Sequence, residues 1–388
     1  MGLGFFLNIK TKHMKKIFTL ILTATFALTA FAQENGFYRI KNTQTGRYLG
    51  IEDTNPANYK VSVQSGTVNV AGIRTHADWK WVSTAPSTVI YIDGLGDGKF
   101  DLMAQGTSIY ELSSHKLPIS LIPQSDGSYQ FYGTAVYQGV SIAKYLQDNV
   151  DGPDDDPDEC FVIADDKPGK GGRNWNLIPV TTGDNYIGIE ANVKTDDGYW
   201  GSIYAGFPFE LASEGMTAYY VKAVSGDGFT LEKISGTIPT ETPVIVKCAS
   251  NDPASNKIKP VTTEGTIISG NKLGGVYCSL YQIGHINMTN YNKSTMRILG
   301  TSNGKVAFVK ATEADLFEGQ ALWGNRAYLS VPAGSPDVLV EGGTGITTIN
   351  AQEAKSEGTY SLTGARIQEG STPKAGIYIQ NGKKVVIK

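Results

Sequence analysis

Clustered carboxylates form the densest group of chemically capable side chains in this chain. Seven acidic residues fall within the twelve-residue stretch DNVDGPDDDPDE, from Asp148 to Glu159. Crowded carboxylates repel one another unless a cation or solvent screens them, and oxygen-rich loops can hold Ca²⁺. The order of the acids differs from that of an EF-hand, and two prolines favour a solvated loop, so we predict no metal site. The calcium candidates in this stretch are Asp154, Asp155, Asp156 and Asp158.

Two other groups combine aromatic and polar side chains in the way a sugar site requires. An aromatic face stacks on a sugar ring, while carboxylates and amides accept hydrogen bonds from its hydroxyls. The loop DTNPANY supplies Asp53, Asn55 and Tyr59, although an ordinary turn explains it more simply. The second group also fits a loop that leads into a strand; its members are Glu190, Asp196, Asp197, Tyr199 and Trp200.

The sequence contains none of the common catalytic motifs that we searched for. No metalloprotease helix, nucleophile elbow or nucleotide-binding glycine pattern is present. We therefore predict no catalytic residue and no cofactor. Glycosidases need only two facing carboxylates, so a glycoside hydrolase or a peptidase stays open as an alternative. The histidines after residue 32 are His76, His115 and His285.

Three cysteines allow one disulfide at most. Cys248 and Cys278 could pair, but buried single thiols are the simpler expectation, because a free cysteine packs like a small hydrophobe. Cys160 is the third, and no two cysteines have the spacing of a zinc or redox motif.

The elements that would position these side chains are strands. The chain has 45 glycines and 20 tyrosines, with short β-branched and aromatic runs throughout. Helical periodicity is confined to the stretch Thr312–Glu318. Tight turns are predicted at Asp93–Asp101 and at Asn303-Gly304. We predict an all-β protein.

Residues 33–181 contain three units of four short strands that end in apolar runs: WKWV at Trp79, ISLIPQ at Ile119 and WNLIPV at Trp175. Such a unit cannot bury its apolar face alone, so closure of three units is expected. With its opening YRIKNTQTGRYLGI, this pattern resembles the β-trefoil of ricin-type lectins, which implies glycan binding. The Gln-x-Trp ending of those lectin repeats is absent from all three units.

Residues 182–341 read as an antiparallel β-sandwich, with short strands joined by tight turns. The segments GTIPTETPVIVK and ALWGNRAYLSVPAG resemble a module of exported Bacteroidetes proteins that accompanies other domains. This resemblance implies no catalytic residue.

Both ends of the chain carry export features. Met14 opens a basic and then apolar segment that ends at Ala32, which predicts a signal peptide over residues 1–32 with its true start at Met14. Residues 342–359 read as a linker. The tail, residues 360–388, places Asn381-Gly382 between two strands and needs a partner to be stable. It resembles the sorting tail read by the Por (type IX) secretion system, which implies contact with that machinery.

The net charge of the chain limits the classes of partner it can bind. Removal of residues 1–32 takes away four lysines, leaving 30 basic and 37 acidic residues, so the net charge changes from −3 to −7. A mildly acidic chain with scattered lysines does not favour nucleic acid, and no second long apolar run predicts a transmembrane anchor. We expect a protein secreted to the cell surface through the periplasm, with a noncatalytic binding or adhesion function and a glycan as partner. A structural subunit that pairs through strand edges is a further alternative.

Overall fold

The computed structural model describes residues 33–51, 61–64, 67–70, 73–104, 107–108, 111–112, 115–116, 118–137, 140–148, 150, 159–165, 170–276, 289–342, 359–361, 376–380 and 383–387. These residues form strands and a few short helical turns, so the all-β prediction is confirmed. The signal-peptide segment, most of the linker, and both groups of loop candidates lie outside the described residues: Asp53, Asn55, Tyr59, Asp154, Asp155, Asp156 and Asp158.

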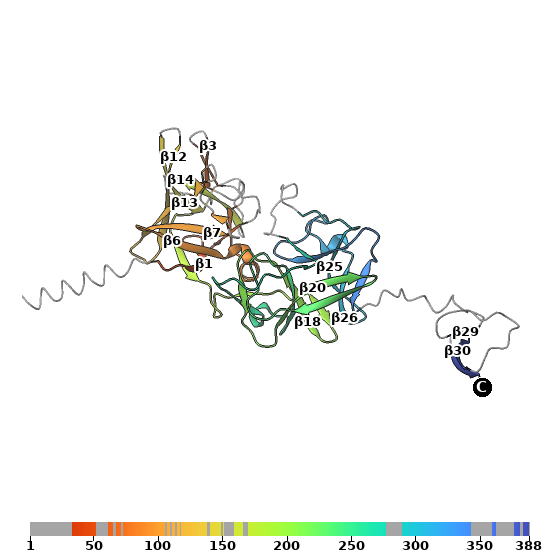
Figure 1. Cartoon of the computed structure of the whole chain (residues 1–388). Helices are drawn as coiled ribbons and strands as arrows, with labels where there is room; N and C mark the ends of the chain where they lie inside the picture. The colour runs from red at the N-terminus through yellow and green to blue at the C-terminus, as the bar shows by residue number, and fades with distance from the viewer. Residues whose placement is uncertain are drawn as a thin grey trace, which may run out of the picture.

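Six strands close a barrel in the first part of the chain (Figure 1). Each strand pairs antiparallel with the next, and the last pairs with the first. In ring order they are β1 (Gly36–Asn42), β6 (Ile90–Gly96), β7 (Lys99–Ala104), β11 (Ile119–Pro123), β12 (Tyr129–Tyr137) and β15 (Trp175–Pro179).

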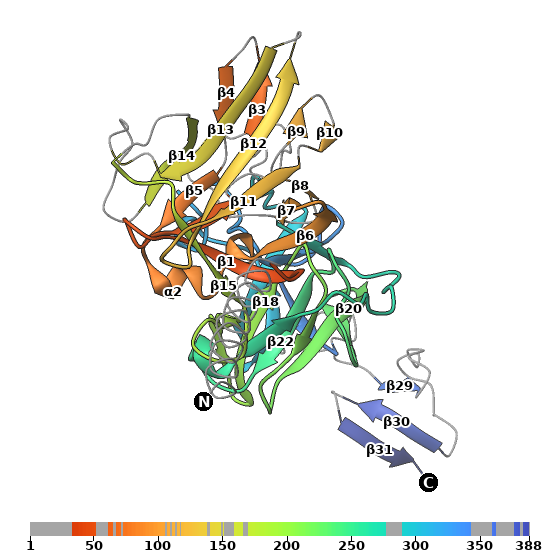
Figure 2. The ribbon, with the colours of Figure 1, turned by 90° about the vertical axis from the view of Figure 1, so that its left-hand side faces the viewer.

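Further strands extend from this barrel (Figure 2). One arc runs from β1 back to β12, and β8 (Thr107–Ser108) continues from β7. Two hairpins form separate sheets: β3 (Val61–Gln64) with β4 (Thr67–Val70), and β9 (Glu111–Leu112) with β10 (His115–Lys116). The arc consists of β2 (Tyr48–Ile51), β5 (Ile73–His76), β14 (Glu159–Asp165) and β13 (Val140–Asp148).

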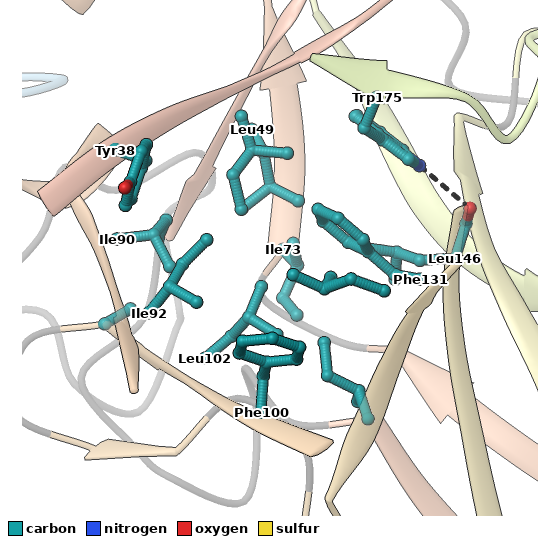
Figure 3. Packing of buried hydrophobic residues seen from close by; sticks show 14 of the residues in the cluster. Tyr38, Leu49, Ile73, Ile90, Ile92, Phe100, Leu102, Phe131, Leu146 and Trp175 are labelled. Carbon is teal, nitrogen blue, oxygen red and sulfur yellow. Dashed lines mark hydrogen bonds between the residues drawn. The ribbon is translucent and has the colours of Figure 1, made fainter. Parts of the chain in front are cut away.

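Alternating apolar residues of these strands fill the barrel (Figure 3). Phe131 and Trp175 stack inside it with ring planes 14° apart. The indole N–H of Trp175 donates to the carbonyl oxygen of Leu146 at 3.0 Å, so the large buried ring leaves no polar atom unpaired. The barrel interior is thus a packed core.

The segment WKWV is a helical turn, α2 (Trp79–Val82), and the prediction that it closes the first unit as a strand is wrong. Asp78 caps the turn by accepting from the Lys80 amide at 2.9 Å. This four-residue segment has three apolar residues and Lys80, a pattern too short to separate a helix from a strand. The strand that follows, β6, pairs with β1, and η1 (Pro86–Thr88) connects α2 to it.

A ten-stranded sheet dominates the second part of the chain. Its pairings are antiparallel except for β21 with β28, which is parallel, so the expected antiparallel order fails at one position. In sheet order the strands are β17 (Val193–Thr195), β18 (Gly198–Ile203), β22 (Val244–Cys248), β20 (Thr217–Ser225), β21 (Gly228–Lys233), β28 (Val338–Glu341), β26 (Lys305–Val309), β25 (Met296–Ser302), β27 (Ala327–Ser330) and β24 (Leu273–Gly275).

Turn chemistry in both sheets follows the sequence prediction. Asp97 and Gly98 join β6 to β7, and Asn303 and Gly304 join β25 to β26, all with positive φ. The predicted helical stretch after Thr312 forms a single 3₁₀ turn, η3 (Glu313–Asp315). A second 3₁₀ turn, η2 (Pro253–Ser255), precedes β23 (Lys257–Pro260). That strand forms a small sheet with β16 (Ile187–Gly188) and β19 (Phe209–Leu211).

The two large sheets are joined by apolar packing and by one buried arginine. Phe37 of β1 packs on Phe207, with ring centroids 5.6 Å apart. The Arg39 side chain is fully buried and donates to the carbonyl oxygens of Val82 at 3.0 Å and Tyr186 at 2.8 Å. It therefore ties α2 to the chain that enters the second sheet.

The predicted tail strands are present. They are β29 (Thr359–Ser361), β30 (Gly376–Gln380) and β31 (Lys383–Ile387), in one antiparallel sheet. Among the described residues this sheet pairs with no other strand.

Candidate functional site

Trp323 is the exposed aromatic side chain around which the candidate site is built. It is 42% exposed, whereas Trp175 and Trp200 are almost fully buried. The edge of its ring meets Phe317 in a T-shaped contact, with centroids 5.2 Å apart and planes at 83°. The guanidinium of Arg326 lies over the ring at 5.9 Å from its centroid. The indole is therefore held in place while part of it faces solvent.

The loop that carries Trp323 is fixed on both sides by backbone hydrogen bonds. The Asn325 amide donates to the carbonyl oxygen of Val276 at 2.7 Å, and the Val276 amide donates back to that of Arg326 at 2.9 Å. The Tyr204 amide donates to the carbonyl oxygen of Asn325 at 2.9 Å. Asn325 has a φ of 57°, a left-handed conformation that asparagine tolerates better than most residues. The loop is preorganised.

Glu190 faces Arg326 in an ion pair of 2.5 Å. The Arg326 side chain is 34% exposed and that of Glu190 50%, so solvent screens the pair and its main effect is to orient both groups. Gly201 of β18 permits this placement, because a Cβ there would come within 2.3 Å of the Glu190 carbonyl oxygen. The pair presents donors and acceptors side by side.

Two adjacent cavities open around these residues, with volumes of about 540 Å³ and 340 Å³. Both volumes fall in the usual range of about 300–1,000 Å³ for small-molecule sites. The two cavities share four lining residues, and together we name them the Trp323 groove. The shared residues are Glu190, Ser202, Trp323 and Arg326.

The barrel supplies the far wall of the smaller cavity through Trp81, Thr84 and Ala85. Trp81 packs on the His76 imidazole, with ring centroids 4.2 Å apart and planes at 37°. Burial, reinforced by the charge of Arg74, lowers the pKa of His76 to about 3, so the imidazole on which Trp81 packs is neutral at physiological pH. The groove thus lies where barrel and second sheet meet.

The second predicted sugar group is divided by the structure. Glu190 lines the groove, but Asp197 accepts from the Thr195 hydroxyl and from the Lys247 ammonium at 2.9 Å. These hydrogen bonds, that of Thr195 first, lower the pKa of Asp197 to about 2. Trp200 is only 4% exposed and offers no stacking face. The Trp200 indole N–H donates to Asp197 at 3.3 Å, so these two side chains lie together, whereas Glu190 pairs with Arg326 in the groove.

The buried thiol of Cys248 is not suited to act as a nucleophile. Cys248 is a free thiol, and burial raises its pKa to about 12, which removes the reactive thiolate. Cys278 lies outside the described residues. In the part of the chain that is described, no group of three or more His, Cys, Asp or Glu is placed to hold a metal ion. None of the described helices has the length and apolar character that a bilayer crossing needs.

Comparison of the chain with protein-family models and with curated protein sequences gives no match.

Sequence reasoning placed the segment ALWGNRAYLSV in a strand and turn and missed Trp323. The available signal was a tryptophan directly before Gly324-Asn325, a pair that indicates a tight and exposed turn. A large aromatic side chain beside such a turn has little core to enter. Trp81, Arg326 and Ser202 carried no comparable signal, because they join the site only through tertiary packing.

Proposed function

We propose that this chain is a secreted, surface-exposed and noncatalytic binding protein that holds a glycan in the Trp323 groove. The carrying observation is Trp323 itself, a 42%-exposed indole in a cavity, with Arg326 and Glu190 beside it. Sugar rings offer apolar C–H faces for stacking and hydroxyls that both donate and accept. A fixed aromatic face with a guanidinium and a carboxylate at its edge suits both features.

The groove contains one residue, Glu190, of the two sugar-binding groups expected from sequence. The other group, in a loop of the N-terminal barrel, lies within residues that the structure does not describe. The groove instead combines Trp81 of the barrel with Trp323 of the second sheet. A site at such a junction is common for small ligands, since two elements converge there to form a concave surface.

A hydrolase is the second candidate, because two carboxylates, Glu190 and Asp315, line the larger cavity. Each already has a partner. Glu190 pairs with Arg326, while Asp315 accepts from the amide of Thr312 at 2.8 Å and from its hydroxyl at 2.7 Å. A glycosidase acid must carry a proton, which an apolar environment favours and which such partners oppose. These contacts support binding without cleavage.

The barrel fits a β-trefoil once its units are redrawn as residues 36–96, 99–123 and 129–179. The first and last strand of each unit then belong to the six-stranded ring, and the middle strands extend from it. This order supports the trefoil interpretation, and in it β6 replaces WKWV as the last strand of the first unit. The second sheet would then serve as a β-sandwich partner that supplies most of the groove.

The proposal also includes export of the chain to the cell surface. The basic and apolar segment after Met14 and the three tail strands β29–β31 support passage through the periplasm and delivery to the surface by Por-type machinery. Replacement of the tail by an unrelated sequence, followed by fractionation of cells, would test this assignment. Continued surface delivery without the tail would contradict it.

Glycan binding is tested by a glycan array with the chain from residue 33 onward, followed by calorimetry on the hits. We expect Trp323→Ala to weaken binding about fivefold or more, because stacking and burial of one aromatic ring contribute about 1–3 kcal/mol. The matched control is Leu95→Ala, which truncates a 46%-exposed side chain on the barrel. Equal affinities of the Trp323→Ala variant and the control would contradict the proposal.

Product analysis of the same hits separates binding from hydrolysis. We expect no release of shorter sugars after prolonged incubation. Cleavage that disappears in Glu190→Gln or Asp315→Asn would instead establish the hydrolase.

A further inference from the structure

We infer that the ligand of the Trp323 groove is a neutral, extended glycan that crosses the junction and uses Trp81 as a second aromatic platform. This inference rests on the proposed glycan function and adds the class and length of the ligand. It depends on three observations: the charge of the groove, the shared lining of its two cavities, and the fixed position of Trp81.

The charges that line the groove cancel. The larger cavity has two acidic residues, Glu190 and Asp315, and two basic ones, Lys194 and Arg326. The smaller cavity has only the paired Glu190 and Arg326. To pair with Arg326, an acidic sugar would have to displace Glu190 and leave that carboxylate without its partner. The net charge of −7 from residue 33 onward further disfavours a polyanion.

The two cavities adjoin. Glu190, Ser202, Trp323 and Arg326 line both, so a chain stacked on Trp323 can contact the two cavities at once. Each cavity alone has the volume of an ordinary small-molecule site. A single sugar ring would leave most of this surface empty, which favours an oligomer as ligand.

Trp81 is held as firmly as Trp323. Its ring lies on His76, and α2, which carries it, receives a hydrogen bond from Arg39 at the Val82 carbonyl. The Gly188 amide also donates to the Ser83 carbonyl oxygen at 2.8 Å, which ties the segment after α2 to β16. Because the platform is fixed before binding, it costs the ligand little ordering entropy.

The test measures binding of neutral oligosaccharide ladders by calorimetry with the chain from residue 33 onward. The probes are gluco-, xylo- and manno-oligosaccharides of two to eight units, with oligogalacturonides as the anionic series. We expect affinity for one neutral series to rise with length. Trp81→Ala should weaken the longest member about tenfold and leave the disaccharide unchanged. Trp323→Ala should weaken both, and Leu95→Ala neither.

Salt provides the second readout. Binding of a neutral chain should change less than about twofold between 0.05 and 0.5 M NaCl, because no ion pair with the ligand is screened. A preference for the anionic series, or a steep loss with salt, would overturn the neutral class. Equal effects of Trp81→Ala at every length would overturn the extended ligand. Both outcomes leave glycan binding intact. If no probe binds, or if Trp323→Ala changes no affinity, the proposed function is contradicted as well.

Discussion

At the scale of single residues, exposure separates the tryptophans by role. Trp175 is buried in the barrel, and its indole N–H donates to the Leu146 carbonyl oxygen. Trp323 is supported by Phe317 and Arg326 but keeps an open face. An exposed aromatic ring loses the burial energy of about 1.5–3 kcal/mol that a core position would supply. Its fixed and partly exposed ring in a cavity is the feature on which the proposed ligand site rests.

His76 gives a prediction for pH. Its folded pKa of about 3 lies below the ordinary value of 6.5, so the unfolded chain binds a proton first as the pH falls. This group therefore lowers the free energy of unfolding between about pH 6.5 and 3, by up to about 1.4 kcal/mol per pH unit. Urea titrations at pH 7, 6 and 5 should show the decline.

The control for this prediction is His76→Gln, which cannot take up the proton. Its free energy of unfolding should vary less between pH 7 and 5 than that of the unchanged chain. Parallel curves for the two proteins would show that His76 does not carry the effect. Comparison above pH 5 avoids most of the carboxyl titrations.

At the scale of elements, the contacts between α2 and β16 hold the two sides of the groove in position. Arg39 donates to Thr88, Val82, Tyr186 and Asn185, which belong to both sides of these contacts. Burial lowers its pKa to about 10, which still leaves it charged at neutral pH. Five donors in a rigid fork suit a site where several carbonyl oxygens converge.

Replacement of Arg39 by methionine should destabilise the protein by about 2–4 kcal/mol, because buried carbonyl groups would lose their donor. The measurement is the urea midpoint and slope. Lys80→Met, on the exposed face of α2, is the matched control and should shift the midpoint little. A midpoint for Arg39→Met that equals the control's would mean that the contacts between α2 and β16 do not depend on this side chain.

At the scale of the whole molecule, the tail is a separate structural unit. Its three strands pair only with one another among the described residues, and Val386 is 65% exposed. Two or three strands bury too little apolar surface to be stable alone, so the tail is suited to a partner.

Deletion of residues 343–388 should leave the unfolding midpoint of the remaining chain unchanged within about 1 °C, because the described tail strands pair with no other strand. For a chain this long, a shift of that size corresponds to less than about 1 kcal/mol. The check is a thermal melt of the shortened and full chains, followed by circular dichroism. A clearly lower midpoint would show that the tail packs on the rest of the molecule.

Local signals predicted much of the fold. Alternating apolar residues marked most strands, and glycine with Asn or Asp marked the turns at Asp97-Gly98 and Asn303-Gly304. Those features act within a few residues and need no partner. WKWV was misassigned because four residues, three of them apolar, are too few to show a period, and the capping residue before them, Asp78, favours a helical turn. Glu190 was among the candidates, but its true partner lies 136 residues away.

Strand content and turn positions were predictable from the chain alone, since these depend on neighbouring residues and on composition. Tertiary packing sets which strands close the barrel, and it brings Trp81, Glu190, Trp323 and Arg326 to the lining of one groove. Contacts between residues so far apart depend on how separate sheets pack, and no local pattern encodes that geometry.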